Sequence, residues 1–113
     1  METKQALAAL SALAQESRLA VFRLLVQAGP EGMAATRIAV QLDISPSSLS
    51  FHLKELTHAG LITPRQDGRF VIYSAQFTTM NDLIAFLTDN CCGGAPCDVP
   101  GACEPAPLGQ GRA

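Results

Sequence analysis

The residues best suited to chemistry in this chain are its cysteines, which gather near the C-terminal end. All four, Cys91, Cys92, Cys97 and Cys103, lie within 13 of the 113 residues, and none occurs earlier. Thiolates are soft ligands that select soft, thiophilic ions. Four cysteines gathered in an otherwise cysteine-free chain indicate a thiol-based function, and all four are candidate metal ligands.

The spacing of the cysteines allows a compact local chelate if the chain bends there. Neighbouring residues point in different directions on a regular helix, so Cys91 and Cys92 reach one ion only where a helix frays. The two glycines that follow permit this bend, and a proline helps to turn Cys97 back. Cys97 is slightly favoured as the third ligand because its loop is shorter; Cys103 can replace it or act as a fourth ligand.

Other interpretations of the cysteines stay open. A tetrahedral zinc or cadmium site is one, although the paired Cys-x-x-Cys spacing of structural zinc is missing. Disulfides are another, which the reducing cytoplasm disfavours. Cys91 would alternatively be a small buried hydrophobe at the end of a helical stripe.

The cysteines fall in a segment of distinct composition. From residue 90 onward the chain holds five of its nine glycines and four of its seven prolines. Such a composition is typical of a flexible tail. We therefore divide the chain into a packed domain, 1–90, and a flexible Cys/Gly/Pro-rich ion-binding tail, 91–113.

Hydrophobic periodicity in the first 90 residues predicts a mainly helical fold with one β-hairpin. The second helix is apolar nearly all round, which predicts a buried central position. The last helix carries an apolar stripe that one further turn extends to Cys91. Helices are expected over 4–15, 16–28, 35–42, 46–59 and 77–90, and strands over 61–63 and 70–74.

Local signals mark where these elements begin and end. Ser45 can cap the fourth helix, and Pro46 suits its first position. Asp67 and Gly68 indicate a hairpin turn between the strands. Two short helices joined by a tight turn and followed by a basic-tipped hairpin make a winged helix-turn-helix, an α+β fold.

Residues 45–56, Ser-Pro-Ser-Ser-Leu-Ser-Phe-His-Leu-Lys-Glu-Leu, together with 59–62, resemble the recognition-helix signature of the ArsR/SmtB family of metalloregulatory repressors. Residues 15–19 resemble the opening of that family's second helix, although the family usually has an Asp-Pro pair there. Asp67-Gly68-Arg69 with Tyr73 resembles its wing. The resemblance covers about residues 4–90 and implies a homodimer that binds double-stranded operator DNA.

The expected DNA-binding residues lie on the recognition helix and the wing. The N-terminal part of such a helix enters the major groove, where side chains contact bases or phosphates. Ser45 is expected only to cap the helix, and His52 suits an orienting role as well as a base contact. The candidates are Ser47, Ser48, Ser50, Phe51, His52 and Lys54 on the helix, with Arg65 and Arg69 on the wing.

Charge and apolar pattern favour a dimer. The net charge is −2, but residues 1–75 carry seven basic and six acidic residues. DNA contact must therefore be focused on a local patch and doubled by a second copy. The first and last helices carry apolar stripes beyond the needs of a small core, as expected for helices that pair in the homodimer.

The resemblance also suggests an inducer. No cysteine lies on the DNA-reading third helix, and the last helix has Asp82 and Asp89 but no histidine, so two familiar metal sites of the family are not expected. The remaining cysteines resemble those of arsenic repressors with a thiolate site at the C-terminal helix. Trivalent arsenic or antimony takes three thiolates in a pyramid, which cancel its formal charge. The resemblance thus implies a repressor released by As(III) or Sb(III), with 91–113 as its metalloid-binding tail.

Three rival functions remain under this interpretation. The same cysteines would serve a repressor that senses cadmium, lead or zinc, or one that senses thiol oxidation. A metal-binding or protein-interaction module that no longer reads DNA belongs to another class. An enzyme is not expected, because neither a nucleophile–base arrangement nor a phosphate-binding glycine loop occurs. No organic cofactor is expected. Neither a membrane-length apolar run nor a signal peptide is found in the sequence, so a cytoplasmic location is expected.

Overall fold

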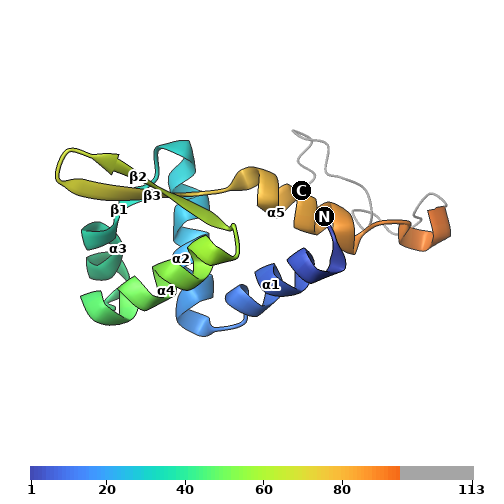
Figure 1. Cartoon of the computed structure of the whole chain (residues 1–113), viewed down its shortest axis with the longest axis horizontal. Helices are drawn as coiled ribbons and strands as arrows, with labels where there is room; N and C mark the ends of the chain where they lie inside the picture. The colour runs from blue at the N-terminus through green and yellow to red at the C-terminus, as the bar shows by residue number, and fades with distance from the viewer. Residues whose placement is uncertain (95–113) are drawn as a thin grey trace.

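The computed structural model describes residues 1–94 (Figure 1). In this part of the chain no helix is long and apolar enough to cross a membrane. The mainly helical fold with a small sheet confirms the predicted winged helix-turn-helix. The elements are α1 (Thr3–Leu13), α2 (Glu16–Ala28), the 3-10 helix η1 (Gly29–Glu31), β1 (Met33–Ala34), α3 (Ala35–Leu42), α4 (Pro46–His58), β2 (Ile62–Asp67), β3 (Phe70–Ala75), α5 (Phe77–Leu87) and the 3-10 turn η2 (Cys91–Gly94).

The helix-turn-helix formed by α3 and α4 matches the sequence prediction closely. Asp43 closes α3 in the left-handed conformation at φ 54°. Ser45 then caps α4, because its Oγ accepts a hydrogen bond from the backbone N–H of Ser48 at 3.3 Å. Pro46 occupies the first turn, where its missing N–H costs nothing. The tight turn between the helices is therefore built from local capping signals.

The wing belongs to a three-stranded antiparallel sheet in the order β1-β3-β2. A two-residue turn with Gly68 at φ 65° joins β2 to β3, and Asp67 pairs with Phe70 across it. The hairpin was predicted, but its first strand is longer than expected and β1 was missed. β1 pairs Met33 with Tyr73, and two residues are too few for an alternating pattern to reveal a strand.

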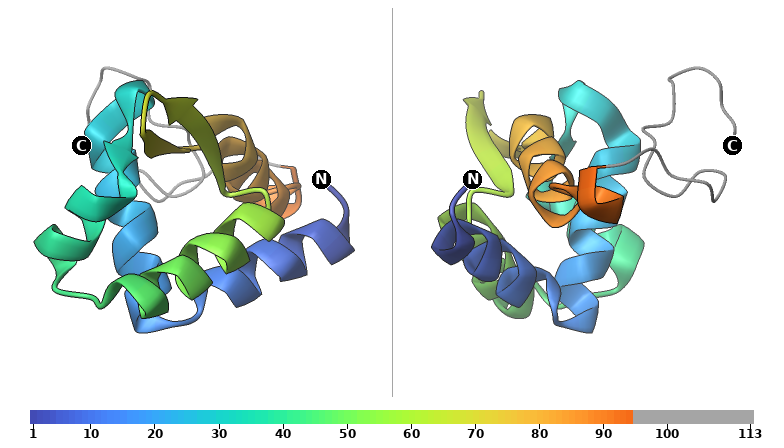
Figure 2. Two further views of the ribbon diagram at one scale, coloured as in Figure 1. Left: turned by 60° about the vertical axis from the view of Figure 1, so that its left-hand side comes forward. Right: turned by 90° about the vertical axis from the view of Figure 1, so that its right-hand side faces the viewer.

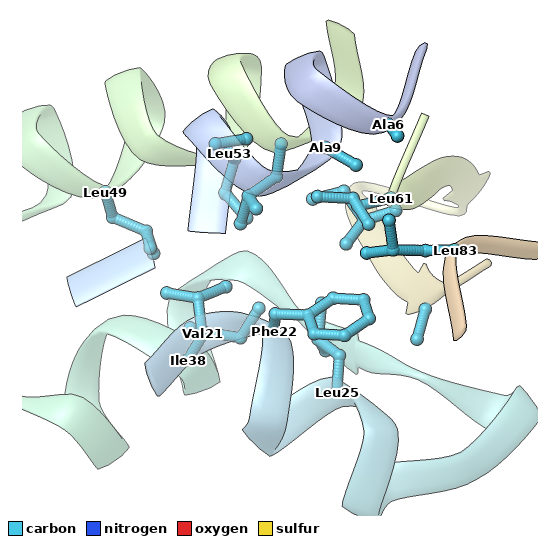
Figure 3. Packing of buried hydrophobic residues seen from close by; sticks show 14 residues of the cluster. Ala6, Ala9, Val21, Phe22, Leu25, Ile38, Leu49, Leu53, Leu61 and Leu83 are labelled. Atoms are coloured by element: carbon cyan, nitrogen blue, oxygen red, sulfur yellow. The ribbon is translucent and has the colours of Figure 1, made fainter. Parts of the chain in front are cut away.

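The core lies where α2 meets α1, α4 and the start of the hairpin (Figure 3). Val21, Phe22 and Leu25 of α2 are buried, but Leu19 is 43% exposed, so α2 is not buried all round as predicted. α1 packs through its small side chains, Ala6 and Ala9, and lies alongside α4 (Figure 2). Small residues let these two helices approach closely.

The apolar stripes of α1 and α5 are largely uncovered in the single chain. Leu7 is 61% exposed, whereas the alanines of α1 face the core. On α5 only Leu83 is buried, and Ile84 and Leu87 are 53% and 58% exposed. These apolar side chains therefore remain exposed on the part of the chain that the structure describes.

α5 ends earlier than the sequence predicted, at Leu87 instead of residue 90. The hydroxyl of Thr88 donates to the carbonyl oxygen of Ile84 at 2.9 Å, and Asn90 turns left-handed at φ 58°. Thr, Asp and Asn compete for backbone hydrogen bonds and are weak helix formers, so the helix stops there. Cys91 consequently begins η2. The prediction that Cys91 extends the apolar stripe of α5 is therefore wrong.

Candidate DNA-reading surface and cysteine site

The solvent side of α4 presents the side chains that the sequence selected for DNA contact. Its buried side is formed by Leu49, Leu53 and Leu56, which fixes the opposite side outward. The first turn carries the hydroxyls of Ser47 and Ser48 at the positive end of the helix dipole, a suitable arrangement for phosphate or base acceptors. Exposed side chains on this face are Ser47, Ser48, Ser50, Phe51 and Lys54.

His52 lies at the edge of this face and is half-buried. Its Nδ1 is buried and has no hydrogen-bond partner within residues 1–94. The ring meets Phe51 edge to face, with ring centroids 5.9 Å apart and an interplanar angle of 63°. The two rings therefore lie side by side at the edge of this face.

The wing presents two arginines in different settings. Arg65 on β2 donates a hydrogen bond from its guanidinium to the carbonyl oxygen of Glu31 at 3.1 Å. This bond ties the hairpin to η1, so Arg65 positions the wing as well as offering charge. Arg69 is exposed in the two-residue turn. A structural role for Arg65 was not foreseen, because the two residues are 34 positions apart.

Figure 1 shows the wing tip, α3 and the first turn of α4 at one end of the long axis, and η2 at the other. Arg37, which is exposed on α3 at the wing end, is a further basic residue beyond the predicted candidates. Its position next to the buried Ile38 on an eight-residue helix was the available signal. The elements that carry the predicted DNA-binding residues thus lie at one end of the molecule, and η2, with Cys91 and Cys92, lies at the other.

At the cysteine end, the sulfur atoms of Cys91 and Cys92 lie 3.7 Å apart. Cys92 adopts the left-handed conformation at φ 57°, and Gly93 follows at φ 67°. The chain thus bends at the two cysteines, where binding of one ion by both would need a bend. Cys91 is disulfide-bonded in this structure, so thiolate chemistry needs a reduced chain. Cys97 and Cys103 lie outside the described residues, and within 1–94 no group of three or more His, Cys, Asp or Glu could hold a metal.

One hydrogen bond links α5 to the end of the recognition helix. The backbone N–H of Gln76, which precedes α5, donates to the carbonyl oxygen of Leu61 at 2.8 Å. Leu61 is fully buried and lies between α4 and β2. The start of α5 is thus joined to the wing through β3, by the chain itself, and to the segment after α4, by this hydrogen bond.

Comparisons with known proteins agree with this arrangement. A model described as a helix-turn-helix domain matches residues 13–65. A candidate arsenical resistance operon repressor, ArsR, of Halobacterium salinarum is 44% identical over 71 residues, which cover 63% of this chain and 52% of that protein. The chain therefore spans about half the length of this curated relative.

Two solved structures extend the comparison. A candidate transcriptional regulator for arsenical resistance is 30% identical, with 77% of this chain and 95% of that chain covered and a TM-score of 0.61. The homodimeric winged helix-turn-helix domain of a candidate ArsR-family regulator from Mycobacterium bovis has a TM-score of 0.63 at 21% identity. That match covers 85% of this chain and 89% of the other. The second shows a shared fold only.

Proposed function

This chain belongs to the ArsR family of winged helix-turn-helix transcriptional regulators, and we propose that it is a homodimeric repressor that arsenite or antimonite releases from operator DNA. The family is one of regulators rather than enzymes. The observation that carries the choice of inducer is the 3.7 Å approach of the Cys91 and Cys92 sulfurs. Two relatives described in connection with arsenical resistance support the same choice.

The sulfur pair suits binding of one soft ion. For comparison, two thiolates held at about 2.3 Å by a tetrahedral ion lie about 3.8 Å apart. In the proposed reaction each hydroxyl of arsenite leaves with a thiol proton as water, and a bond from arsenic to sulfur replaces it. Cys91 and Cys92 supply two of the three sulfurs, and Cys97 or Cys103 supplies the third.

DNA is proposed to lie against the end that carries the wing tip and the first turn of α4. Ser47, Ser48 and Ser50 would meet acceptors in the major groove, with Phe51 against a thymine methyl. Lys54, Arg65 and Arg69 would meet phosphates. The exposed Ile84 and Leu87 of α5, with Leu7 of α1, would pair with the same residues of a second copy. The repressor would act in the cytoplasm.

Release of DNA requires the ion to bind the DNA-free form better than the DNA-bound form. The proposed path runs along α5. Ion binding reshapes η2 at its end, the dimer contacts of Ile84 and Leu87 shift, and the Gln76–Leu61 hydrogen bond carries the shift to α4 and the wing. The two recognition helices then lose the spacing of about one DNA turn that a two-fold operator needs.

The test begins with duplex DNA that the reduced, full-length protein selects from a random pool. Arsenite is then titrated into the complex, and release is followed by fluorescence anisotropy. We expect release from the wild type and none from Cys92→Ser. Asp89→Asn is the matched control: it removes a neighbouring carboxylate charge that binding of a soft ion does not need, so it should respond like the wild type.

Two outcomes would refute the proposal in different ways. If no duplex is selected, the chain is not a DNA-reading repressor, and the alternative function as a metal-binding or protein-interaction module is favoured. If arsenite leaves the wild-type complex intact, the inducer is wrong. Cadmium, lead and zinc are titrated in parallel to identify another soft ion.

The disulfide at Cys91 favours thiol oxidation as the second candidate signal. A repressor of that kind would release DNA when a peroxide converts two thiols to a disulfide and is itself reduced to water. Peroxide added to the reduced complex, followed by thiol reductant, distinguishes the two signals. Release by peroxide without release by arsenite would favour oxidation sensing.

A further inference from the structure

The wing carries an exposed aromatic side chain that the DNA-reading residues above do not include. Phe70 is the first residue of β3 after the turn, and 54% of it is exposed. The cross-strand register places Phe70 opposite Asp67 and on the same face of the hairpin as Arg65, which pairs with Ile72. This ring therefore lies at the tip of the wing, away from the core.

Phe70 is exposed on a hairpin whose two strands are paired along their whole length. β2 and β3 are paired from Ile62 and Ala75 out to Asp67 and Phe70. Arg65 holds this hairpin to η1 through the Glu31 carbonyl oxygen. The ring is thus presented at a fixed position, and burying it later costs little further ordering.

We propose that Phe70 packs against the deoxyribose edges of the minor groove beside each half-site, and this rests on the proposed function. The tip lies at the same end of the molecule as the first turn of α4 (Figure 1), so DNA that receives α4 also meets the wing. Apolar side chains commonly wedge into minor grooves. The adjacent Arg69 supplies charge toward the phosphates, whereas Asp67 opposite the ring disfavours a phosphate at that spot.

Phe70 therefore contributes affinity that does not depend on salt. A phosphate contact releases counterions, so its loss lowers the slope of log affinity against log salt. Loss of an apolar contact lowers affinity equally at every salt concentration. This difference separates the role of Phe70 from that of Arg69.

The experiment compares Phe70→Ala, Phe70→Leu and Arg69→Ala on the DNA selected by the wild type, at several salt concentrations. We expect Phe70→Ala to bind about 10- to 100-fold more weakly as a dimer, with an unchanged salt slope. Phe70→Leu keeps an apolar side chain and should stay within about threefold of wild type. Arg69→Ala should reduce the slope by about 2 for two copies.

The outcomes distinguish this inference from the proposed function. Wild-type protein that binds no duplex would refute the proposed function itself. Wild-type binding with Phe70→Ala unchanged, or with a reduced salt slope, would overturn the minor-groove role. A change in oligomeric state of Phe70→Ala in sedimentation would assign the ring to a contact between copies instead. Thermal unfolding of Phe70→Ala beside the wild type verifies that the variant remains folded.

Discussion

The sulfur atoms of Cys91 and Cys92 lie 3.7 Å apart because Cys92 leaves the helical conformation for the left-handed one. On a regular helix, neighbouring side chains diverge and would not meet in this way. The bend after α5 thus converts two adjacent cysteines into a two-sulfur bite. That geometry makes the pair a separable part of the proposed three-sulfur site.

The first prediction tests this pair with a trivalent arsenical that takes only two sulfurs. Reduced Cys97→Ser/Cys103→Ser should still bind phenylarsine oxide through Cys91 and Cys92. The same variant should bind arsenite at least about 100-fold more weakly, since it lacks a third ligand. Intact-mass spectrometry and calorimetry measure both. Adding Cys92→Ser to this background should abolish phenylarsine oxide binding. Retained binding would show that Cys91 and Cys92 do not bind the arsenical as a pair.

The second prediction concerns the uncovered stripe of α5. Ile84→Asp places an unpaired charge in the proposed symmetric interface, so dimerisation should weaken at least about 100-fold. Val40→Asp is the control, because Val40 is even more exposed, at 82%, but lies on α3. Sedimentation velocity over a range of concentrations measures both variants. Equal behaviour of the two would remove α5 from the interface.

Local signals predicted much of the fold. The bounds of α2 and α3 were predicted correctly because breakers and caps lie beside them, and Ser45 does cap α4. The errors have long-range or competing causes. β1 exists only because β3, about 40 positions away, pairs with it, and α5 stops where polar side chains take over its backbone hydrogen bonds.

The third prediction tests β1 through Gly32. Gly29 and Gly32 share nearly the same backbone conformation, with φ 79° and 75° and ψ −168° and −164°. A Cβ at Gly29 meets nothing within 4 Å, whereas at Gly32 it would collide with the carbonyl oxygen of Tyr73. Both alanine variants should lose about 1–3 kcal/mol from backbone strain. Gly32→Ala should lose about 1–3 kcal/mol more from the collision.

Urea unfolding at a fixed protomer concentration measures the difference between the two glycine variants. The comparison cancels the shared backbone cost and isolates the approach of Gly32 to β3. Equal losses would mean that β1 and β3 separate without cost.

The fourth prediction tests the cap of the recognition helix. Ser45→Ala removes the acceptor for the Ser48 N–H and should cost about 1 kcal/mol of stability, which Ser45→Asp should restore. Ser47→Ala, two positions beyond the cap, should stay within about 0.5 kcal/mol. Urea unfolding measures all three. A loss with Ser47→Ala as large as that with Ser45→Ala would contradict the assignment of the cap.

The exposed surface of the candidate site could be predicted from the sequence, but the contact of Arg65 with Glu31 and the backbone conformation of Cys92 could not. The spacing of the α4 leucines fixed which side chains face outward, so Ser47, Ser50 and Phe51 were correctly placed on the exposed face. No pattern in the sequence could indicate that Arg65 reaches Glu31. A bend at Cys91 and Cys92 was expected, but not that Cys92 itself turns left-handed. Such contacts depend on how distant segments meet, or on one residue's backbone angle.

The fifth prediction concerns how strongly salt weakens DNA binding. The wing end offers four basic side chains per protomer, Arg37, Lys54, Arg65 and Arg69. For a dimer, log affinity against log salt should therefore fall no more steeply than about −7. Lys54→Ala should reduce the slope by about 2, whereas Lys4→Ala, on α1 far from the wing, should leave it unchanged. Anisotropy titrations between about 50 and 200 mM salt measure the slope. An equal reduction by Lys4→Ala would contradict the proposed position of DNA at the wing end, because α1 would then share the phosphate contacts.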